Sequence, residues 1–364
     1  MLIDRVERLP RPEPDVNQFL AVLRRERPQR VPMLELKLDD EVAGALLGEP
    51  LVPWRKDAPA DQRRRAVRQT VSLMHRLGYD AVRLRAGFPF ELIKEPVADT
   101  AGLSRGERQW QSEHSGPIQS LRDAERYRWP TPADVDFGPA EEIARELPDG
   151  MGCVGFCGGV FEWSSWLMGL VPFSIALYDQ PELVRTVVDR VGQLVYEVFE
   201  VWCQADHVVA LWSGDDMGFK TATLVCPDHL REYILPWHRR YAELAHARGK
   251  PYILHSCGNI KAIMPDLVED VGIDARHSFE DVIEPVEEFV HAWGDRVAAI
   301  GGVDVDLLAR GSEEDVVRRT RQILEACAPR GGYAAGSGNS VTNYVPVENY
   351  LAMVETVHRF NGRA

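Results

Sequence analysis

The sequence predicts an α/β protein folded as a (β/α)8 barrel. With 364 residues, the chain is long enough to bury a sizeable core in one large domain. From residue 151 onward, short apolar stretches alternate with longer stretches of helical periodicity, and two earlier alternating stretches bring the β–α units to eight. Eight such units over this length are typical of a closed barrel of parallel strands. An open, doubly wound sheet is the alternative.

Composition limits the classes of partner. Hydrophobic residues make up 45% of the chain and charged residues 27%, which is typical of a globular protein. The net charge of −14 argues against nucleic acid or an anionic membrane as the main partner. The apolar runs are too short to span a bilayer, and the first residues lack the apolar core of a signal peptide. Because the six cysteines are scattered, we expect reduced thiols and a cytoplasmic protein.

The first part of the chain contains two of the predicted strands. Residues 1–30 are polar and form an N-terminal extension with a helix near Val16–Arg25, and the barrel domain occupies 31–364. Val31–Leu38 alternates strictly, as a strand does. A helix follows at Asp61–Leu77, and Tyr79–Arg85 alternates again.

Residues 86–150 are irregular and rich in proline and charge, so we expect an insertion after the second strand. A regular alternation of strands and helices follows it. The remaining strands are expected at Met151–Cys157, Asp206–Trp212, Pro251–His255, Ile273–His277, Arg296–Gly301 and Gly331–Gly336. The helices are expected at Pro181–Gln204, Pro227–Arg248, Ile260–Val271, Val286–Trp293, Glu313–Cys327 and Pro346–Phe360.

Side-chain parity in the two early strands predicts which residues line the barrel. The apolar set is expected to point outward beneath the helices, and it comprises Leu34, Leu36, Leu38, Val82 and Leu84. The polar set would then face inward, and it comprises Glu35, Lys37, Arg83 and Arg85. Because buried, unpaired charge is costly, this inner face is expected to bind a substrate. An internal network of salt bridges is the alternative.

His255 and Cys257 are the candidate metal ligands. Residues two apart in a strand point to the same side, so the imidazole and the thiol project together at the end of Pro251–His255. Both groups are preferred zinc ligands, and Gly258 permits a tight turn after them. A hydrogen-bonded polar pair at the end of a strand is the alternative interpretation.

Polar residues also follow the other strands, where barrel enzymes carry their catalytic groups. We expect catalytic roles for Asp215 and Asp216, which lie together between glycines, and for His277 and Glu162. Trp163 and Asn339 are expected to contact the substrate. The remaining polar residues of these loops are Cys157, Glu280, Asp281, Asp304 and Ser337.

These features, taken in order, resemble the uroporphyrinogen decarboxylase superfamily. The matching stretches are SGDDMGF (213–219), LREYILPWHRRY (230–241), HSCGN (255–259), AIGGVDVDLLARG (299–311) and GGYAAGSGNSVTNYVPVENYLAM (331–353). The resemblance implies a (β/α)8 barrel and one of two chemistries. One branch decarboxylates uroporphyrinogen without a cofactor, and the other consists of zinc enzymes that move methyl groups to or from a corrinoid.

The HSCG stretch resembles the zinc motif of the methyltransferases, which implies that His255 and Cys257 bind zinc. The decarboxylase signatures are absent: ELKLDDEVAG stands where that branch has an arginine-rich segment after the first strand, and RLRAGFPF stands where it has an aspartate that grips the pyrrole NH groups. The methyltransferases take a third ligand, a cysteine, from the loop after the last strand, but here that loop (336–340) has no thiol. Asp215, Asp216 or His277 could replace it, with Cys157 next in reach.

We therefore expect a zinc-dependent methyltransferase that moves a methyl group between a small substrate and a corrinoid, the latter carried on a partner protein. A homodimer is one assembly left open. A cofactor-free decarboxylase of a small carboxylic acid or porphyrinogen is the second hypothesis, with Arg83 and Arg85 gripping the carboxylate. A non-catalytic member that binds a small molecule or a corrinoid is the third.

Overall fold

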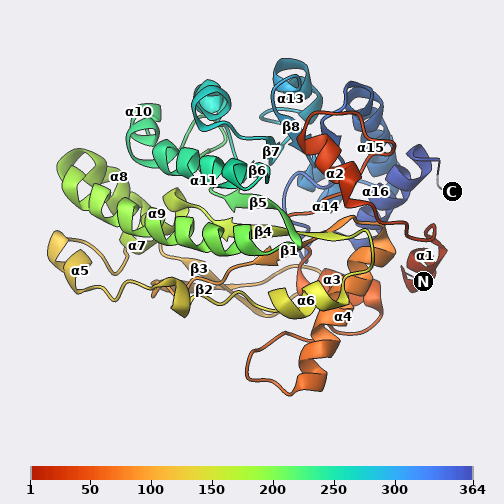
Figure 1. The fold of residues 1–364 in the computed structure, drawn as a ribbon, viewed down its shortest axis with the longest axis horizontal. Coiled ribbons are helices and arrows are strands. Elements are labelled where there is room, and N and C mark those ends of the chain that lie inside the picture. The colour runs from red at the N-terminus through yellow and green to blue at the C-terminus, as the bar shows by residue number, and fades with distance from the viewer. Residues whose placement is uncertain (1, 363–364) are drawn as a thin grey trace.

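A computed structural model describes residues 2–362 and is organised around a curled parallel sheet (Figure 1). The seven strands follow one another in the order β1-β4-β5-β6-β7-β8-β9, and every neighbouring pair is parallel. Their bounds are β1 Ala81–Arg85, β4 Gly152–Gly158, β5 Val208–Gly214, β6 Tyr252–His255, β7 Ala275–His277, β8 Ala298–Ile300 and β9 Tyr333–Ala334. The α/β class and the parallel sheet are therefore confirmed.

Amphipathic helices cover the outer face of the sheet, as Figure 1 shows. Helix α4 packs on β1, α9 on β4 and β5, α11 on β6, and α13 on β8, while α15 packs on α16. Their bounds are α4 Ala60–Leu77, α9 Pro181–Gln204, α11 Leu235–Ala247, α13 Val286–Trp293, α15 Glu313–Cys327 and α16 Val347–Phe360. Each buries one stripe of apolar residues, which is how a helix packs against a sheet.

Several shorter helices complete the fold. The α-helices are α1 Leu2–Arg8, α2 Val16–Leu23, α3 Asp40–Leu47, α5 Leu121–Arg126, α6 Ala140–Glu146, α7 Val160–Met168, α8 Leu170–Asp179, α10 Pro227–His229, α12 Met264–Asp266 and α14 Val305–Arg310. The 3-10 and π turns are η1 Pro132–Asp134, η2 Leu230–Ile234, η3 Lys261–Ile263, η4 Leu267–Val271 and η5 Ala328–Arg330. The helices expected at 227–248 and 260–271 are both interrupted, because Pro236 and Pro265 cannot donate a helical hydrogen bond.

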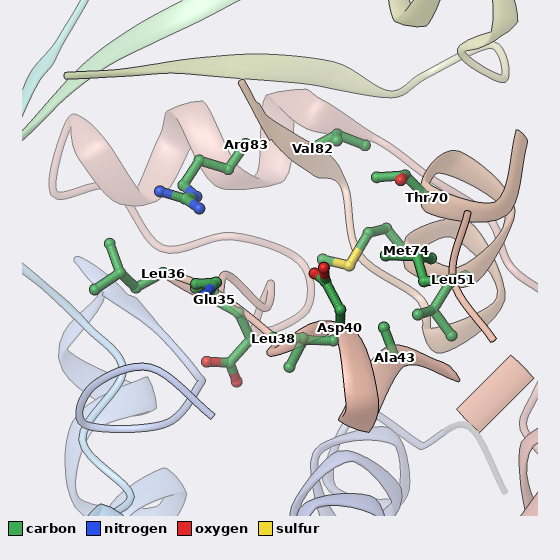
Figure 2. Close-up of a pocket in the computed structure, with 12 residues that line it drawn as sticks. Glu35, Leu36, Leu38, Asp40, Ala43, Leu51, Thr70, Met74, Val82 and Arg83 are labelled. Carbon is green, nitrogen blue, oxygen red and sulfur yellow. The ribbon is translucent and has the colours of Figure 1, made fainter. Parts of the chain in front are cut away.

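The prediction of a strand at 31–38 is wrong. The segment makes only isolated parallel bridges, Met33 with Ala335 and Leu38 with Val341, and it bends at Leu36. On its other side, no backbone hydrogen bond joins it to β1 within residues 2–362. The sheet is therefore curled but not closed by strand pairing. A cavity of about 210 Å³ lies between the segment and β1, and Figure 2 shows the side chains that line it.

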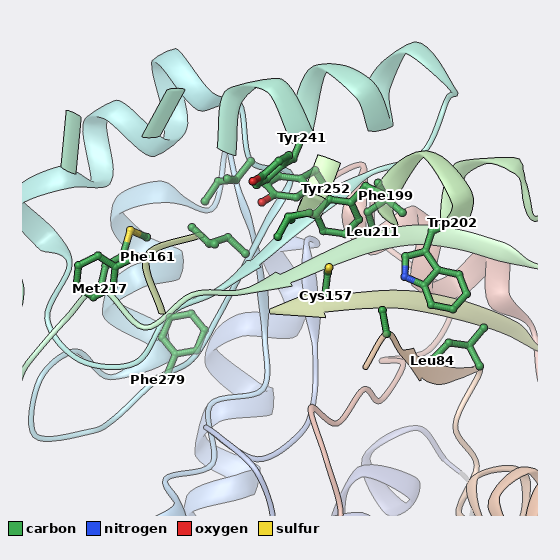
Figure 3. Packing of buried hydrophobic residues seen from close by; sticks show 14 of the residues in the cluster. Leu84, Cys157, Phe161, Phe199, Trp202, Leu211, Met217, Tyr241, Tyr252 and Phe279 are labelled. Atoms are coloured by element: carbon green, nitrogen blue, oxygen red, sulfur yellow. The ribbon is translucent and has the colours of Figure 1, made fainter. Parts of the chain in front are cut away.

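The apolar core has an inner and an outer part. The inner cluster fills the concave side of the sheet with small and large residues from successive strands, such as Ala210, Trp212 and Ile253. Helix α2 closes one end of it with Phe19 and Val22. The outer cluster lies between the sheet and the helices, and Figure 3 shows its labelled members: Leu84, Cys157, Phe161, Phe199, Trp202, Leu211, Met217, Tyr241, Tyr252 and Phe279.

The two clusters test the parity prediction. In β1, Ala81 belongs to the inner cluster and Val82 and Leu84 to the outer one, so alternation places Arg83 on the inner face as expected. For the first segment the prediction is wrong, because Leu34 and Leu36 belong to the inner cluster. A segment that pairs on one side only, and bends, does not keep the orientation of a barrel strand.

The insertion contains a two-stranded antiparallel hairpin, β2 Lys94–Ala98 and β3 Glu107–Gln111. Its tip binds to the start of α3 and to the chain after β9. Arg105 donates to Asp39 Oδ2 at 2.8 Å, and Asn343 Nδ2 donates to Asp99 Oδ2 at 2.7 Å. These bonds fix the hairpin beside the start of α3 and the chain that follows β9.

Among the described residues, no single helix has both the length and the apolar character needed to cross a membrane. Helices α7 and α8 meet that test only when they are taken together, and they are bent by 95° at the break between them.

Candidate functional site

Three potential metal ligands converge at the carboxyl ends of β5 and β6. The strand register places Gly214 beside His255 and His255 beside His277, so these residues share one level of the sheet. Asp216 and Cys257 each lie two residues farther along the chain. The Asp216 carboxylate, the His255 imidazole and the Cys257 thiol offer ligand atoms that all lie within 4.8 Å of one another.

The distances suit a tetrahedral zinc site. His255 Nε2 lies 3.3 Å from Cys257 Sγ and 3.3 Å from Asp216 Oδ1. Ligand atoms at standard zinc distances in a tetrahedron lie about 3.3 to 3.6 Å apart. Three protein ligands with a free fourth position are typical of catalytic zinc rather than structural zinc. The donor set therefore fits the metal that the sequence led us to expect.

His277 orients the His255 ring. His255 Nδ1 and His277 Nδ1 are 2.6 Å apart, and His277 Nε2 lies 3.2 Å from the Ser337 carbonyl. Burial and the adjacent His255 lower the pKa of His277 well below its ordinary value, so this ring is neutral. If His277 Nε2–H donates to the carbonyl, Nδ1 must accept from His255, and His255 presents an unprotonated Nε2 to the ligand cluster.

Asn339 lies where the resemblance led us to expect a third cysteine. Its Nδ2 donates to Cys257 Sγ at 3.1 Å, and the Cys257 N–H donates to Asp216 Oδ1 at 2.9 Å. Burial, followed by the nearby Asp216 carboxylate, raises the pKa of the Cys257 thiol well above its ordinary value. A bound cation would reverse this effect and favour the thiolate.

Glu162 and Asp216 form an acidic pair at the site. Burial raises the pKa of Asp216, but the adjacent His255 ring and the hydrogen bond from the Cys257 N–H outweigh it and leave that pKa below its ordinary value. Burial, with Asp216 and then Asp215 nearby, raises the pKa of Glu162 well above its ordinary value. The pair can therefore hold one proton on Glu162 and a charge on Asp216. Glu162 belongs to helix α7, which the sequence did not predict.

Asp215 points away from the ligand cluster. Its carboxylate accepts hydrogen bonds from the backbone N–H groups of Phe161 and Glu162 at 3.0 and 2.9 Å, at the start of α7. It also lies 2.8 Å from His238 Nε2, and His238 Nδ1 lies 2.8 Å from the Tyr252 hydroxyl. Asp215 thus holds the helix that carries Glu162. His238 was not among the predicted site residues, although it lies in the stretch 230–241 that carries part of the family resemblance.

Glu35 lies beneath the loop that carries Asn339. Its carboxylate accepts the Ser337 N–H at 3.0 Å and lies 3.3 Å from the Tyr79 hydroxyl, which is 2.6 Å from the Tyr350 hydroxyl. Burial raises the pKa of Glu35 to about 7, although the bonds from Ser337 act to lower it. Glu35 therefore supports the loop through Ser337.

The remaining residues predicted to contact the substrate come from the segment 31–38, from β1 and from α7. Lys37 is bound to Asp39 Oδ1 at 2.8 Å. Arg83 and Arg85 extend from β1, and Arg85 is close enough to Glu162 to lower its pKa. The Trp163 ring packs on Phe88 and Phe90. Cys157, the reserve ligand, belongs to the outer core and takes no part in the cluster (Figure 3).

Fold and site together define a class of protein: an α/β protein with a curled parallel sheet and a His–Cys–Asp cluster at the carboxyl ends of its strands. The family model "Uroporphyrinogen decarboxylase (URO-D)" matches residues 56–360. The chain therefore belongs to the uroporphyrinogen decarboxylase family.

Its relatives come from both branches. The uroporphyrinogen decarboxylase of Anaeromyxobacter dehalogenans is 27% identical over 259 residues, or 67% of this chain and 70% of the relative. The methylated-thiol–coenzyme M methyltransferase of Methanosarcina mazei is 34% identical over 135 residues, but these cover only 37% of this chain and 34% of the relative. The solved structure of a methyltransferase from Methanosarcina mazei matches 96% of this chain and 99% of its own, with a TM-score of 0.68 and 19% identity.

Proposed function

We propose that the protein is a zinc-dependent methyltransferase that moves a methyl group between a small substrate and a corrinoid. The observation that carries the proposal is the convergence of Asp216, His255 and Cys257 at distances that suit zinc. The homologous stretch of the methyltransferase from Methanosarcina mazei supports it. The corrinoid would be carried on a partner protein. We further propose that the curled sheet acts as a (β/α)8 barrel in which the irregular segment 31–38 occupies the place of the first strand.

Each residue of the site has a task in this reaction. Zinc, when bound by Asp216, His255 and Cys257, would supply a Lewis acid for the substrate heteroatom. His277 keeps the proton of His255 on Nδ1 and its Nε2 free. Asn339 donates to the sulfur of Cys257 and moderates its charge. Glu162 holds a proton beside Asp216 and can deliver it to the heteroatom that loses its methyl group.

A carboxylate ligand in place of the third cysteine makes this zinc a harder Lewis acid. Zinc with two thiolates favours soft thiol substrates, whereas an Asp–His–Cys set favours oxygen. An O-methyl substrate therefore suits this site better than a thiol does.

The second candidate is a cofactor-free decarboxylase of a small acid. The protonated Glu162 near Arg85 favours it, because that chemistry needs a proton donor and a cation for the substrate carboxylate. The identity with uroporphyrinogen decarboxylases over 67% of the chain also supports it.

Metal content separates the two candidates. We expect one zinc per chain in the wild-type protein, and loss of zinc in Cys257→Ser and Asp216→Asn with the fold retained by circular dichroism. Cys226 is an exposed free cysteine, so Cys226→Ser is the matched control and should keep the metal. Methyl transfer to cob(I)alamin, followed by its absorbance, should then require the zinc. A metal-free protein that releases CO2 from small acids would refute the proposal in favour of the decarboxylase.

A further inference from the structure

Arg83 is a cation without a counterion on the inner face of the sheet. It comes from β1, and its guanidinium carbon lies 4.6 Å above the centre of the Phe156 ring. There is room for the Phe156 ring because residue 214 is a glycine: a Cβ at that position would lie only 2.6 Å from Phe156 Cζ. Aromatic stacking thus holds the guanidinium flat and leaves the N–H edge of its fork free.

No acid neutralises this charge. Within residues 2–362, no carboxylate oxygen lies within 4.0 Å of the Arg83 side chain, and its N–H groups have no hydrogen-bond acceptor. Glu35 lines the same cavity, but Figure 2 shows its carboxylate directed away from Arg83. Burial, followed by the like charge of Arg85, lowers the pKa of Arg83 to about 9. A partly buried guanidinium whose N–H groups have no acceptor is a favourable place for an anion.

A second free donor comes from helix α7 and lies against β4, the strand that carries Phe156. The Trp163 indole is 8% exposed, and its Nε1–H is buried without a partner. Nε1 lies 2.4 Å from the place that a Cβ on Gly158 would occupy. Gly158 and Phe156 are two residues apart in β4, so both face the inner side, about 7 Å apart along the strand. The Arg83 guanidinium and the Trp163 indole N–H therefore lie on the same inner side of the sheet, and both lack an acceptor.

We propose that Arg83 and the Trp163 indole bind a carboxylate of the substrate, which makes the substrate a small carboxylic acid. A guanidinium fork matches the two oxygens of a planar carboxylate, and the indole adds a donor to one of them. The like-charged neighbour Arg85 strengthens the preference for an anion.

The strand order sets the size of this acid. The sheet order β1-β4-β5-β6 places three strand spacings between Arg83 and His255, which is about 14 Å along a flat sheet. Because the sheet curls and the side chains point inward, the gap between Arg83 and the His255 ring is shorter. A substrate with one ring or a short chain spans a gap of this length.

This inference rests on the proposed function, because it assigns the substrate of the same site. The test measures binding alone, on the protein as purified and without any corrinoid. Isothermal titration at low salt would compare benzoate, its neutral isostere benzamide, and phenylphosphonate. We expect benzoate to bind at least about tenfold more tightly than either of the others.

Variants locate the binding. Arg83→Gln should weaken benzoate binding by about tenfold or more, and Arg83→Lys by less, because an ammonium lacks the planar fork. Arg240→Gln is the matched control, because Arg240 also stacks on an aromatic ring, Trp237, but on the exterior. Its affinity should stay unchanged. Thermal unfolding gives a second readout: Arg83→Gln should be at least as stable as the wild type, since it removes an unpaired charge.

Equal affinity for benzoate and benzamide, unchanged affinity in Arg83→Gln, or preference for phenylphosphonate would each overturn the assignment of a carboxylate. A large loss of stability in Arg83→Gln would show a structural role instead and would also overturn it. The metal content and methyl transfer of the same Arg83→Gln protein are measured separately. A protein without methyl transfer that still binds benzoate through Arg83 would refute the proposed function and leave this inference standing.

Discussion

Replacing Glu35 by glutamine tests whether the loop that carries Asn339 rests on a protonated acid. The Ser337 hydroxyl contacts both the Glu35 carboxyl and the Asn339 carbonyl, and it has only one proton to donate. A protonated Glu35 resolves this, because it donates to the hydroxyl, which in turn donates to the carbonyl. Glutamine reproduces that arrangement with its amide N–H and does not titrate.

The magnitude follows from the pKa of Glu35, which burial raises from 4.5 to about 7 in the folded protein. Between those values the folded state keeps a proton that the unfolded chain releases, so stability falls as the pH rises. The loss begins near pH 4.5 and is complete above pH 7. A shift of this size corresponds to about 3 kcal/mol in the free energy of unfolding, as an upper bound.

Urea unfolding of the wild type and Glu35→Gln at pH 5, 6, 7 and 8 would measure this term. The difference in unfolding free energy between the two proteins should change in favour of Glu35→Gln as the pH rises, by up to about 3 kcal/mol. Other groups titrate equally in both proteins and cancel. A difference that stays constant from pH 5 to pH 8 would refute the reasoning and show that Glu35 does not change protonation in this range.

Two further substitutions test buried contacts. Gly159→Ala places a methyl group 2.0 Å from the Asp215 side chain, so we expect it to lower the melting temperature and weaken α7, while Gly102→Ala, with no atom within 4 Å, should do neither. Glu284→Ala leaves the buried Arg276 without its carboxylate, and urea unfolding should report a loss of about 3 to 5 kcal/mol; a loss below 1 kcal/mol would mean that water reaches the guanidinium.

The sequence predicted those features that depend on local periodicity. The alternation of strands and helices after residue 151 was confirmed, because each amphipathic helix must cover the strand that precedes it. The inward direction of Arg83 was confirmed as well, because its neighbours Val82 and Leu84 pack outward beneath the helices. The proximity of His255 and Cys257 could be predicted because residues two apart in an extended segment point to the same side, and their side-chain atoms do lie together. Their role as zinc ligands stays a prediction.

The features that the sequence missed depend on contacts between distant segments. Asp215 and Asp216 are adjacent and chemically alike, yet one caps α7 and the other joins the cluster, because the chain turns after β5 ends. The alternation of side-chain directions ends with the strand, so it does not predict where either carboxylate points. Likewise, Val31–Leu38 alternates as a strand does, but whether it pairs on both sides is decided by β1 and the cavity between them.

The one-sided pairing of residues 31–38 has a consequence for how a ligand enters. A barrel that is hydrogen-bonded around its full circumference can widen only if ladder bonds break. Within residues 2–362, this sheet has a seam between residues 31–38 and β1 that no backbone hydrogen bond crosses. Outward movement of residues 31–38 at the seam would expose Arg83 without breaking a backbone hydrogen bond to β1, whereas the loop that carries Asn339 stays tied to Val303 and Phe279 by backbone hydrogen bonds. Hydrogen exchange should therefore find the weakest protection on the two edges of the seam.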